Sequence, residues 1–210
     1  MARKTKAEAA ATRGKILDAA ESLFFEHGVT RTSLEQIADE AGVTRGAIYW
    51  HFANKVDLFR ALHERTRLPQ EDLVEQVVAD GHPDPLGFIE QISLDCLKTI
   101  AADMRMQRVS AILLFRCEYV GEMAEALKRQ EDADAVMRNN LLRIFTMAAD
   151  NGTLSPVWGP DIAAKVFESM IHGLWADWLR YGQNFDIVEV GTKCVAELFE
   201  AFRGKSGHRS

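Results

Sequence analysis

The chain lacks several features that would assign it to a common structural class. Its three cysteines, Cys96, Cys117 and Cys194, are odd in number and widely spaced, which argues against a disulfide scaffold and a structural zinc site. No apolar run approaches the roughly 18 residues of a membrane-spanning helix. The first residues also lack the apolar segment of a signal peptide. These absences predict a globular protein of the reducing cytoplasm with no membrane partner.

Proline and strand-like patterns are scarce as well. Four of the five prolines lie in two predicted loops, residues 81–85 and 152–160. No segment alternates polar and apolar residues as a half-buried strand does. Apolar residues instead recur at helical spacing along most of the 210 residues, a length sufficient to bury a core. The sequence therefore predicts an all-α fold.

The chain is not basic overall, since 25 Lys and Arg face 31 Asp and Glu, a formal net charge of −6. That balance speaks against nucleic-acid binding, because phosphates attract basic surfaces. The charge is unevenly divided, however. Residues 1–67 hold 11 basic and 9 acidic side chains, and residues 68–210 hold 14 and 22. A near-neutral head thus precedes an acidic body. The leading edge of the head is basic, since its first fifteen residues carry Arg3, Lys4, Lys6, Arg13 and Lys15 against Glu8.

Capping signals divide the chain into about nine predicted helices. In the head, Glu8 and Gln36 complete capping boxes with the first two N-cap candidates, and Gly28 marks the end of the first helix. The fourth helix is expected to kink or end at Pro69 and to continue, bent, to about residue 80. The predicted N-cap residues are Thr5, Ser33, Thr44 and Asn54 in the head, and Asp84, Asp103 and Asp186 in the body.

Residues 33–52, SLEQIADEAGVTRGAIYWHF, contain two short capped helices separated by Ala-Gly-Val. This spacing is typical of a helix-turn-helix motif. The second helix of that motif lies in the major groove, with its N-terminal residues nearest the bases. Arg45 can donate two hydrogen bonds to guanine O6 and N7, and Gly46 has no side chain to hold the backbone away from DNA.

Polar side chains around the predicted base contact are suited to phosphates. Thr44 can cap the helix and contact a phosphate, while Tyr49 and His51 offer hydrogen bonds. Lys55 adds a positive charge beside the N-terminus of the next helix. The alternative is a helical hairpin buried in a core. Tyr49, Trp50 and His51 argue against it, because three consecutive bulky residues with polar edges cannot all face one core.

These residues resemble a known family. Residues 9–58 are similar to the DNA-binding domain of the tetracycline-repressor (TetR/AcrR) family, whose signature matches residues 44–58, TRGAIYWHFANKVDL. The opening MARKTK and residues 42–52 resemble the branch that represses multidrug efflux pumps. Residues 115–123, FRCEYVGEM, resemble the ligand domain of the same branch. The likeness covers the first third of the chain closely and the remainder thinly.

The resemblance implies an all-helical homodimer that binds a palindromic double-stranded DNA operator. Residues 1–53 would form a helix-turn-helix DNA-binding domain and residues 54–80 a linker helix. Residues 81–203 would form a ligand-binding and dimerisation domain, and residues 204–210 a disordered tail. The last two predicted helices are apolar on more than one face, which favours a four-helix dimer interface over burial within one subunit.

The resemblance also implies roles in DNA binding. Arg45 would read a base, and Phe52 would belong to the core. The basic arm, Arg3, Lys4 and Lys6, would either reach along the duplex or remain a solvated tail. The residues expected to hold the DNA backbone are Thr32, Ser33, Thr44, Tyr49, His51 and Lys55.

A pocket for a small hydrophobic or aromatic effector is implied in the second domain. Ordinary bundle core is the alternative for each candidate wall. Glu168 interrupts an apolar stretch; it would select cationic compounds if it faced the pocket, and would otherwise face solvent. The candidate walls are Ile89, Ile92, Ser93, Cys96, Ser110, Leu113, Leu114, Cys117, Met137, Leu141, Phe145, Glu168, Met170, Ile171, Leu174 and Trp175.

The leading hypothesis is a repressor of a multidrug efflux operon that small hydrophobic compounds release from DNA. The same fold could instead control a metabolic operon in response to an acyl or aromatic metabolite, or activate transcription. An enzyme is not predicted, because the chain has no His-Glu-x-x-His, Gly-x-Ser-x-Gly, P-loop or paired-cysteine motif. No cofactor or metal is expected. A redox role for Cys117 competes with that of a small buried hydrophobe.

Overall fold

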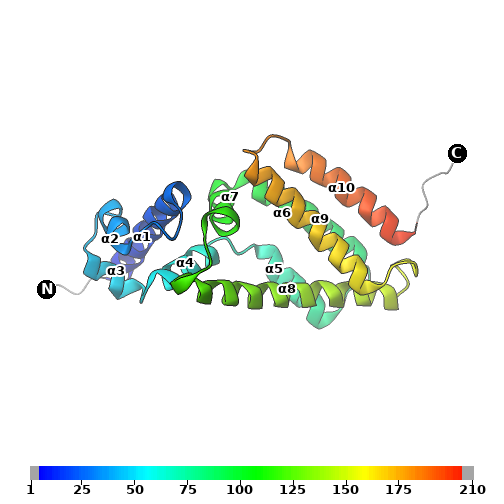
Figure 1. Ribbon diagram of the computed structural model, residues 1–210. Helices are drawn as coiled ribbons and strands as arrows, with labels where there is room; N and C mark the ends of the chain where they lie inside the picture. The colour runs from blue at the N-terminus through cyan, green and yellow to red at the C-terminus, as the bar shows by residue number, and fades with distance from the viewer. Residues whose placement is uncertain (1–4, 205–210) are drawn as a thin grey trace. The chain divides into compact units, whose positions relative to one another are not determined.

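The computed structural model describes residues 5–204, and within that range it confirms the all-α prediction (Figure 1). Arg3 and Lys4 of the predicted basic arm, and residues 205–210 of the predicted tail, lie outside the described residues. The elements are α1 (Lys6–His27), α2 (Leu34–Glu40), α3 (Arg45–His51), α4 (Lys55–Glu64), α5 (Pro69–Asp80), α6 (Pro85–Ala102), α7 (Met104–Ala111), a π-helical turn η1 (Ile112–Arg116), a 3-10 turn η2 (Gly121–Met123), α8 (Ala124–Asp150), α9 (Pro160–Arg180) and α10 (Ile187–Arg203).

Local side-chain caps begin six of the helices in the described range at predicted residues. Ser33 Oγ accepts a hydrogen bond from the Gln36 N–H at 3.2 Å, and Gln36 Oε1 accepts one from the Ser33 N–H at 2.8 Å. Thr5 and Glu8 form the same reciprocal pair. Asn54 Oδ1 accepts from the Asp57 N–H at 2.8 Å. Each cap satisfies N–H groups that the first helical turn leaves without partners.

The predicted bent helix over residues 54–80 is in fact two helices, α4 and α5. Leu68 has an extended backbone with ψ 136°, and Pro69 occupies the first position of α5. Proline disfavours a helical conformation in the residue before it and lacks the N–H that would continue a helix. This separation raises the number of α-helices in the described range from about nine to ten.

The chain divides into two compact units. Within the described range, the head unit comprises residues 5–67 and 105–130, and the body unit comprises residues 68–104 and 131–204. Residues 105–130 therefore pack with the helix-turn-helix, although the sequence predicted them within the ligand domain. They complete a core that includes Ile16, Phe24, Ile48, Phe59, Val109, Ile112 and Met123.

Gly28 permits a close backbone contact in the head unit. The Val29 N–H donates to Arg116 O at 2.9 Å. Gly28 has φ 84° and ψ 156°, a combination that is open almost only to glycine. A Cβ atom at this position would also lie 3.3 Å from Arg116 O. Gly28 thus allows the loop after α1 to approach the end of η1 closely enough for the bond from Val29 to Arg116.

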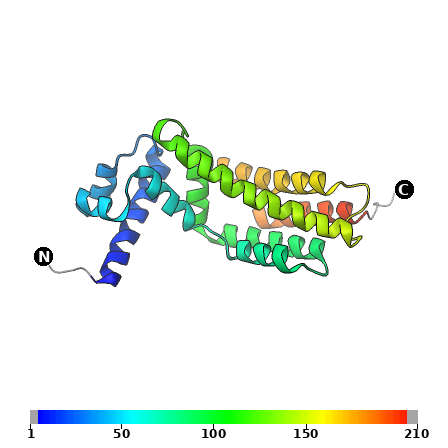
Figure 2. The same cartoon turned by 90° about the horizontal axis from the view of Figure 1, so that it is seen from below.

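The body unit is a helical bundle of α5, α6, the later part of α8, α9 and α10 (Figures 1 and 2). A cluster of aromatic rings fills one part of it, with neighbouring centroids 5.1 to 6.0 Å apart. The rings belong to Phe145, Trp158, Phe167, Phe199 and Phe202. No helix in the described range combines the length and the apolar composition needed to span a membrane.

Candidate DNA-binding surface and ligand cavity

Helix α3 is held firmly on α2, which gives its outer face a fixed orientation. Ile37 of α2 and Ile48 of α3 are fully buried, and the Val43 N–H donates to Ala38 O at 2.9 Å. Gly42 makes the turn with φ 63°, a left-handed conformation that favours glycine. Thr44 Oγ1 accepts from the Ala47 N–H at 3.3 Å and caps α3 as predicted.

The outer face of α3 exposes large side chains. Tyr49 is 47% exposed and Trp50 72% exposed, so the expectation that residues 49–51 do not all face one core is confirmed. Phe52 is 2% exposed and belongs to the core, also as expected. Such large exposed aromatic residues on a capped helix are typical of a contact surface.

Arg45 is exposed at the N-terminus of α3, where the helix-turn-helix motif places its base contacts. Its guanidinium carbon lies 5.6 Å from the centroid of the Tyr49 ring, and its Nη2 lies 3.3 Å from the Tyr49 hydroxyl. The two side chains are one helical turn apart, so the pair restricts the rotamers of the arginine. A preoriented guanidinium suits recognition of a guanine edge.

Gly46 has no intramolecular reason to be a glycine. It lies inside α3 and is exposed. A Cβ atom there would have its nearest neighbour, Thr44 Oγ1, at 3.9 Å, an ordinary contact. Glycine in a helix costs about 0.5–1 kcal/mol relative to alanine. The close approach of another molecule to the backbone explains the glycine best.

A groove with a volume of about 660 Å³ runs between the start of α1 and α3. Lys6 of the predicted basic arm lines it, together with Thr44 and His51 of the predicted contact set. Thr12 and Trp50 line it too and were not predicted as contacts. For Trp50, the helical spacing of residues 44, 47 and 50 on one face was the available signal.

Two of the predicted phosphate contacts, Thr32 and Lys55, are buried in the head unit. Thr32 is 2% exposed, and its hydroxyl donates to Gly28 O at 2.8 Å. Lys55 is 8% exposed, and its Nζ lies 2.8 Å from Glu122 Oε1 and 3.2 Å from Thr32 O. These groups have internal partners in the structure. Ser33 is exposed, and its hydroxyl oxygen caps α2.

Charged side chains join α1 to α4 and α7 within the head unit. Asp18 Oδ1 lies 2.6 Å from Arg65 Nη1. Glu21 is 7% exposed, and its carboxylate oxygens lie 3.5 Å from Arg105 and 3.6 Å from Arg108. Burial raises the pKa of the Glu21 carboxyl, and the two arginines oppose that rise.

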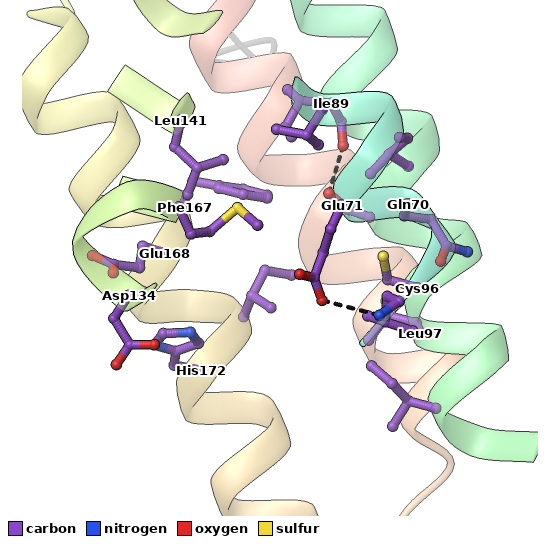
Figure 3. Close-up of a pocket in the computed structure, with 17 residues that line it drawn as sticks. Gln70, Glu71, Ile89, Cys96, Leu97, Asp134, Leu141, Phe167, Glu168 and His172 are labelled. Carbon is purple, nitrogen blue, oxygen red and sulfur yellow. Dashed lines mark hydrogen bonds between the residues drawn. The ribbon is translucent and has the colours of Figure 1, made fainter. Parts of the chain in front are cut away.

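The body unit contains a mainly apolar cavity of about 210 Å³ between α5, α6, α8 and α9 (Figure 3). Half of the predicted walls line it: Ile89, Ile92, Ser93, Cys96, Met137, Leu141, Glu168 and Ile171. The sequence reasoning missed the residues contributed by α5, because that segment was interpreted as a linker. The unpredicted lining residues are Leu68, Gln70, Glu71, Val74, Leu97, Ile100, Asp134, Phe167 and His172.

The other predicted walls do not line this cavity, for three reasons. Four of them belong to the head unit, and Phe145 packs in the aromatic cluster. The last three lie on α9 outside the lining set. The four in the head unit are Ser110, Leu113, Leu114 and Cys117, and the three on α9 are Met170, Leu174 and Trp175.

The polar lining of the cavity is partly acidic. Among the residues that the structure describes, its lining includes three carboxylates, Glu71, Asp134 and Glu168, beside His172, and no lysine or arginine. The Glu168 side chain is 10% exposed, and its Oε2 lies 2.9 Å from Nζ of the exposed Lys165. Glu71 Oε1 accepts from the Leu68 N–H at 3.0 Å, one of the hydrogen bonds drawn in Figure 3.

Cys96 and Cys117 have little thiolate character. Burial raises the pKa of the cavity-lining Cys96 and of Cys117 to about 11. A neutral thiol reacts slowly with oxidants, which supports the interpretation of Cys117 as a small hydrophobe. Among the described residues, no group of three His, Cys, Asp or Glu side chains is arranged to hold a metal ion.

An exposed helix-turn-helix face and a separate helical unit with an apolar cavity define a helical DNA-binding regulator. Models of the tetR family of bacterial regulatory proteins and of the C-terminal region of MAATS-type transcriptional repressors match residues 16–62 and 84–203, respectively. The chain belongs to the tetR family of bacterial regulatory proteins.

Its relatives include several named regulators. The transcriptional repressor BepR of Brucella suis is 40% identical over 205 residues, or 96% of each chain. The crystal structure of NalD, the secondary repressor of the MexAB-OprM multidrug efflux pump in Pseudomonas aeruginosa, matches 94% of this chain and 96% of its own with a TM-score of 0.80 and 36% identity. A SmeT–triclosan complex matches with a TM-score of 0.80 and 30% identity, covering 91% of each chain.

Proposed function

We propose that this chain is a ligand-responsive transcriptional repressor that controls a multidrug efflux operon. The observation that carries the proposal is the pairing of two features in one chain: the exposed N-terminus of α3, with Arg45 and Gly46, and an apolar cavity in the body unit. NalD, a relative over almost the whole chain, is named as a repressor of an efflux pump. Because operator binding requires access to chromosomal DNA, we infer a cytoplasmic location.

Arg45 is the proposed base-reading residue, since it is exposed at the end of α3 that meets the major groove. Lys6 and the α3 residues that line the groove would hold the phosphate backbone on either side of it. The set of proposed contacts is Lys6, Thr12, Ser33, Thr44, Arg45, Gly46, Tyr49, Trp50 and His51.

A homodimer would present two copies of α3 to a palindromic operator, with half-sites about 34 Å apart. The proposed interface is the outer face of α9 and α10. Ile162 is 55% exposed and Val166 37% exposed, and Met170 and Leu174 continue this α9 face half-buried. Phe167, Trp178 and the aromatic residues of α10 are buried within the body unit, so they would support the interface from behind.

The cavity is the proposed effector site. Its apolar walls suit a small hydrophobic or aromatic compound, and a relative, SmeT, is known in complex with triclosan. The three carboxylates of its lining disfavour an anionic acyl metabolite, since like charges repel at close range. They favour neutral or cationic aromatic compounds.

Footprinting on the DNA upstream of the gene tests the proposal, with and without candidate efflux substrates. We expect the protein to protect a palindromic sequence from cleavage. A compound that binds the protein should abolish this protection. The compound should raise the thermal stability of the protein and lower its operator affinity, because it must bind the two conformations with different affinities to shift their equilibrium. Tight binding of efflux substrates without a change in operator affinity would contradict ligand control.

A further inference from the structure

An amide side chain on the α5 wall of the cavity has one polar atom without a partner. Gln70 is the second residue of α5 and belongs to the cavity lining. Its Oε1 is buried and has no hydrogen-bond partner among the residues that the structure describes. Because a buried acceptor without a donor destabilises a fold, such an atom calls for a functional explanation.

The neighbouring hydrogen bonds decide which end of the Gln70 carboxamide is the nitrogen. Gln70 Nε2 donates to Thr99 Oγ1 at 3.4 Å. The Thr99 hydroxyl uses its own hydrogen in a bond of 2.9 Å to the carbonyl oxygen of Asp95. Thr99 can therefore only accept from Gln70, so the amide atom beside it must be the nitrogen. The oxygen is the atom that remains without a donor.

The position of Gln70 makes this oxygen available to a molecule in the cavity. Thr99, which holds the nitrogen, is outside the described cavity lining. Figure 3 shows Gln70 on the α5 side of the cavity, opposite Phe167 and Glu168 of α9. The bond to Thr99 is long. A small turn of the carboxamide can thus present the oxygen to a ligand without the loss of a strong interaction.

The chemistry of this acceptor defines a class of ligand. A carbonyl oxygen accepts hydrogen bonds and cannot donate them, so it recognises an O–H or N–H group and not an ether or a second carbonyl. The mainly apolar lining strengthens such a bond. The carboxylates of the lining also oppose the ionisation of a phenol, which keeps its hydrogen in place.

We infer that Gln70 is a specificity-determining residue of the cavity, whose Oε1 accepts a hydrogen bond from an O–H or N–H group of an aromatic effector. Among compounds of similar size and hydrophobicity, the cavity selects those that carry such a donor. A compound without one leaves the oxygen unpaired and binds more weakly. This inference rests on the proposed role of the cavity as the effector site.

Two ligands that differ in the donor test the inference. The compound para-phenylphenol offers a phenolic O–H, and its methyl ether, para-methoxybiphenyl, has a methyl group in place of that hydrogen. Calorimetry with the full chain would measure both affinities for the wild type, Gln70→Leu and Gln91→Leu. Leucine is close to glutamine in size and has no polar side-chain atom. Gln91 is the matched control, because it is exposed on α6 and outside the described cavity lining.

We expect the ratio of phenol to ether affinity to fall about tenfold in Gln70→Leu, or about 1.4 kcal/mol. The fall should come from weaker binding of the phenol, because the ether makes no bond to Oε1 in the wild type. Gln91→Leu should keep the wild-type ratio. Without ligand, Gln70→Leu should melt no lower than the wild type, since it removes a buried atom that has no partner.

Three outcomes would overturn the inference. An unchanged ratio in Gln70→Leu would assign the ligand donor to another acceptor, of which Glu71 is the next along α5. Equal losses for both ligands would show that Gln70 only shapes the cavity. Wild-type protein that binds the ether as tightly as the phenol would show that the cavity does not select for a donor.

Two further measurements keep the test decisive. Gln70→Met, which is unbranched like glutamine, replaces Gln70→Leu if the leucine variant does not fold, and the same fall in the ratio is expected. A wild-type protein that binds neither ligand would refute the proposed effector site itself. The operator footprint tests that site independently of Gln70, so failure of the proposed function and failure of this inference are distinguishable.

Discussion

Arg45 and Tyr49 form a cation–π pair on the outer face of α3, with the guanidinium carbon 5.6 Å from the ring centroid and Nη2 3.3 Å from the hydroxyl. The contact with Tyr49 restrains the Arg45 side chain, so the guanidinium N–H groups that Tyr49 does not use have a fixed direction. A restrained donor loses less conformational entropy when it binds a base edge. This geometry makes Arg45 the best candidate for base reading and Tyr49 its support.

The first prediction concerns Arg45→Ala. We expect it to cost about 1–3 kcal/mol of operator affinity and to relax the preference at one base position in each half-site, because a bidentate contact to one guanine is lost. Affinity for a set of operators with single base changes would measure this. Tyr49→Phe, which keeps the ring and removes the hydroxyl, should retain the preference in weaker form. A uniform loss over all bases would assign Arg45 to the backbone.

The second prediction concerns Gly46→Ala, which should change stability and DNA binding in opposite directions. Alanine should raise the free energy of unfolding by up to about 1 kcal/mol, because it favours the helix and meets no close neighbour. The added methyl group should lower operator affinity, because it holds the α3 backbone away from DNA. Denaturant unfolding and anisotropy would measure the two effects. Unchanged affinity would show that the backbone at Gly46 does not approach DNA closely.

The third prediction follows from the buried carboxyl of Glu21. Burial raises its pKa above the ordinary value of 4.5, so the folded protein binds this proton more tightly than the unfolded chain does. Its contribution to stability is complete below pH 4.5 and is lost as the pH rises through the raised folded-state pKa.

Glu21→Gln should therefore remove one component of the pH dependence of unfolding. The difference in unfolding free energy, wild type minus variant, should fall as the pH rises through this window. Denaturant titrations of both proteins at a series of pH values would measure it. The control is Asp18→Asn, which replaces an exposed carboxylate on the same helix. This substitution should not reproduce that fall. A difference that rises with pH would mean that the arginines outweigh the burial.

The fourth prediction concerns the charge preference of the cavity. Glu168→Gln should weaken the binding of an aromatic monocation more than that of its uncharged analogue, because the cavity loses one of its three carboxylates. Calorimetry with the two compounds would measure the difference. Glu197→Gln, which removes the same charge from an exposed position of α10 outside the cavity lining, is the matched control. Equal losses for both compounds would show that Glu168 acts on cavity shape rather than on ligand charge.

The secondary structure was largely readable from the sequence because its signals are local. Ser33 and Gln36, or Asn54 and Asp57, meet across three residues, so their types predict a helix start without knowledge of any distant segment. The outer face of α3 was predictable for the same reason, since a capped helix fixes which residues share a face. Even Pro69 marked the break, although the prediction favoured a bend over a new helix.

The parts that escaped prediction depend on segments distant in the chain. The burial of Lys55 has no local signal, because its ion-pair partner Glu122 lies 67 residues away. Residues 105–130 carry no signal for membership of the head unit, because their burial depends on packing against α1 to α4. The acidic cavity likewise combines Glu71, Asp134 and Glu168 from three helices. Local chemistry thus set the helices and the recognition face, and long-range packing set which charges are buried, paired or turned toward a ligand.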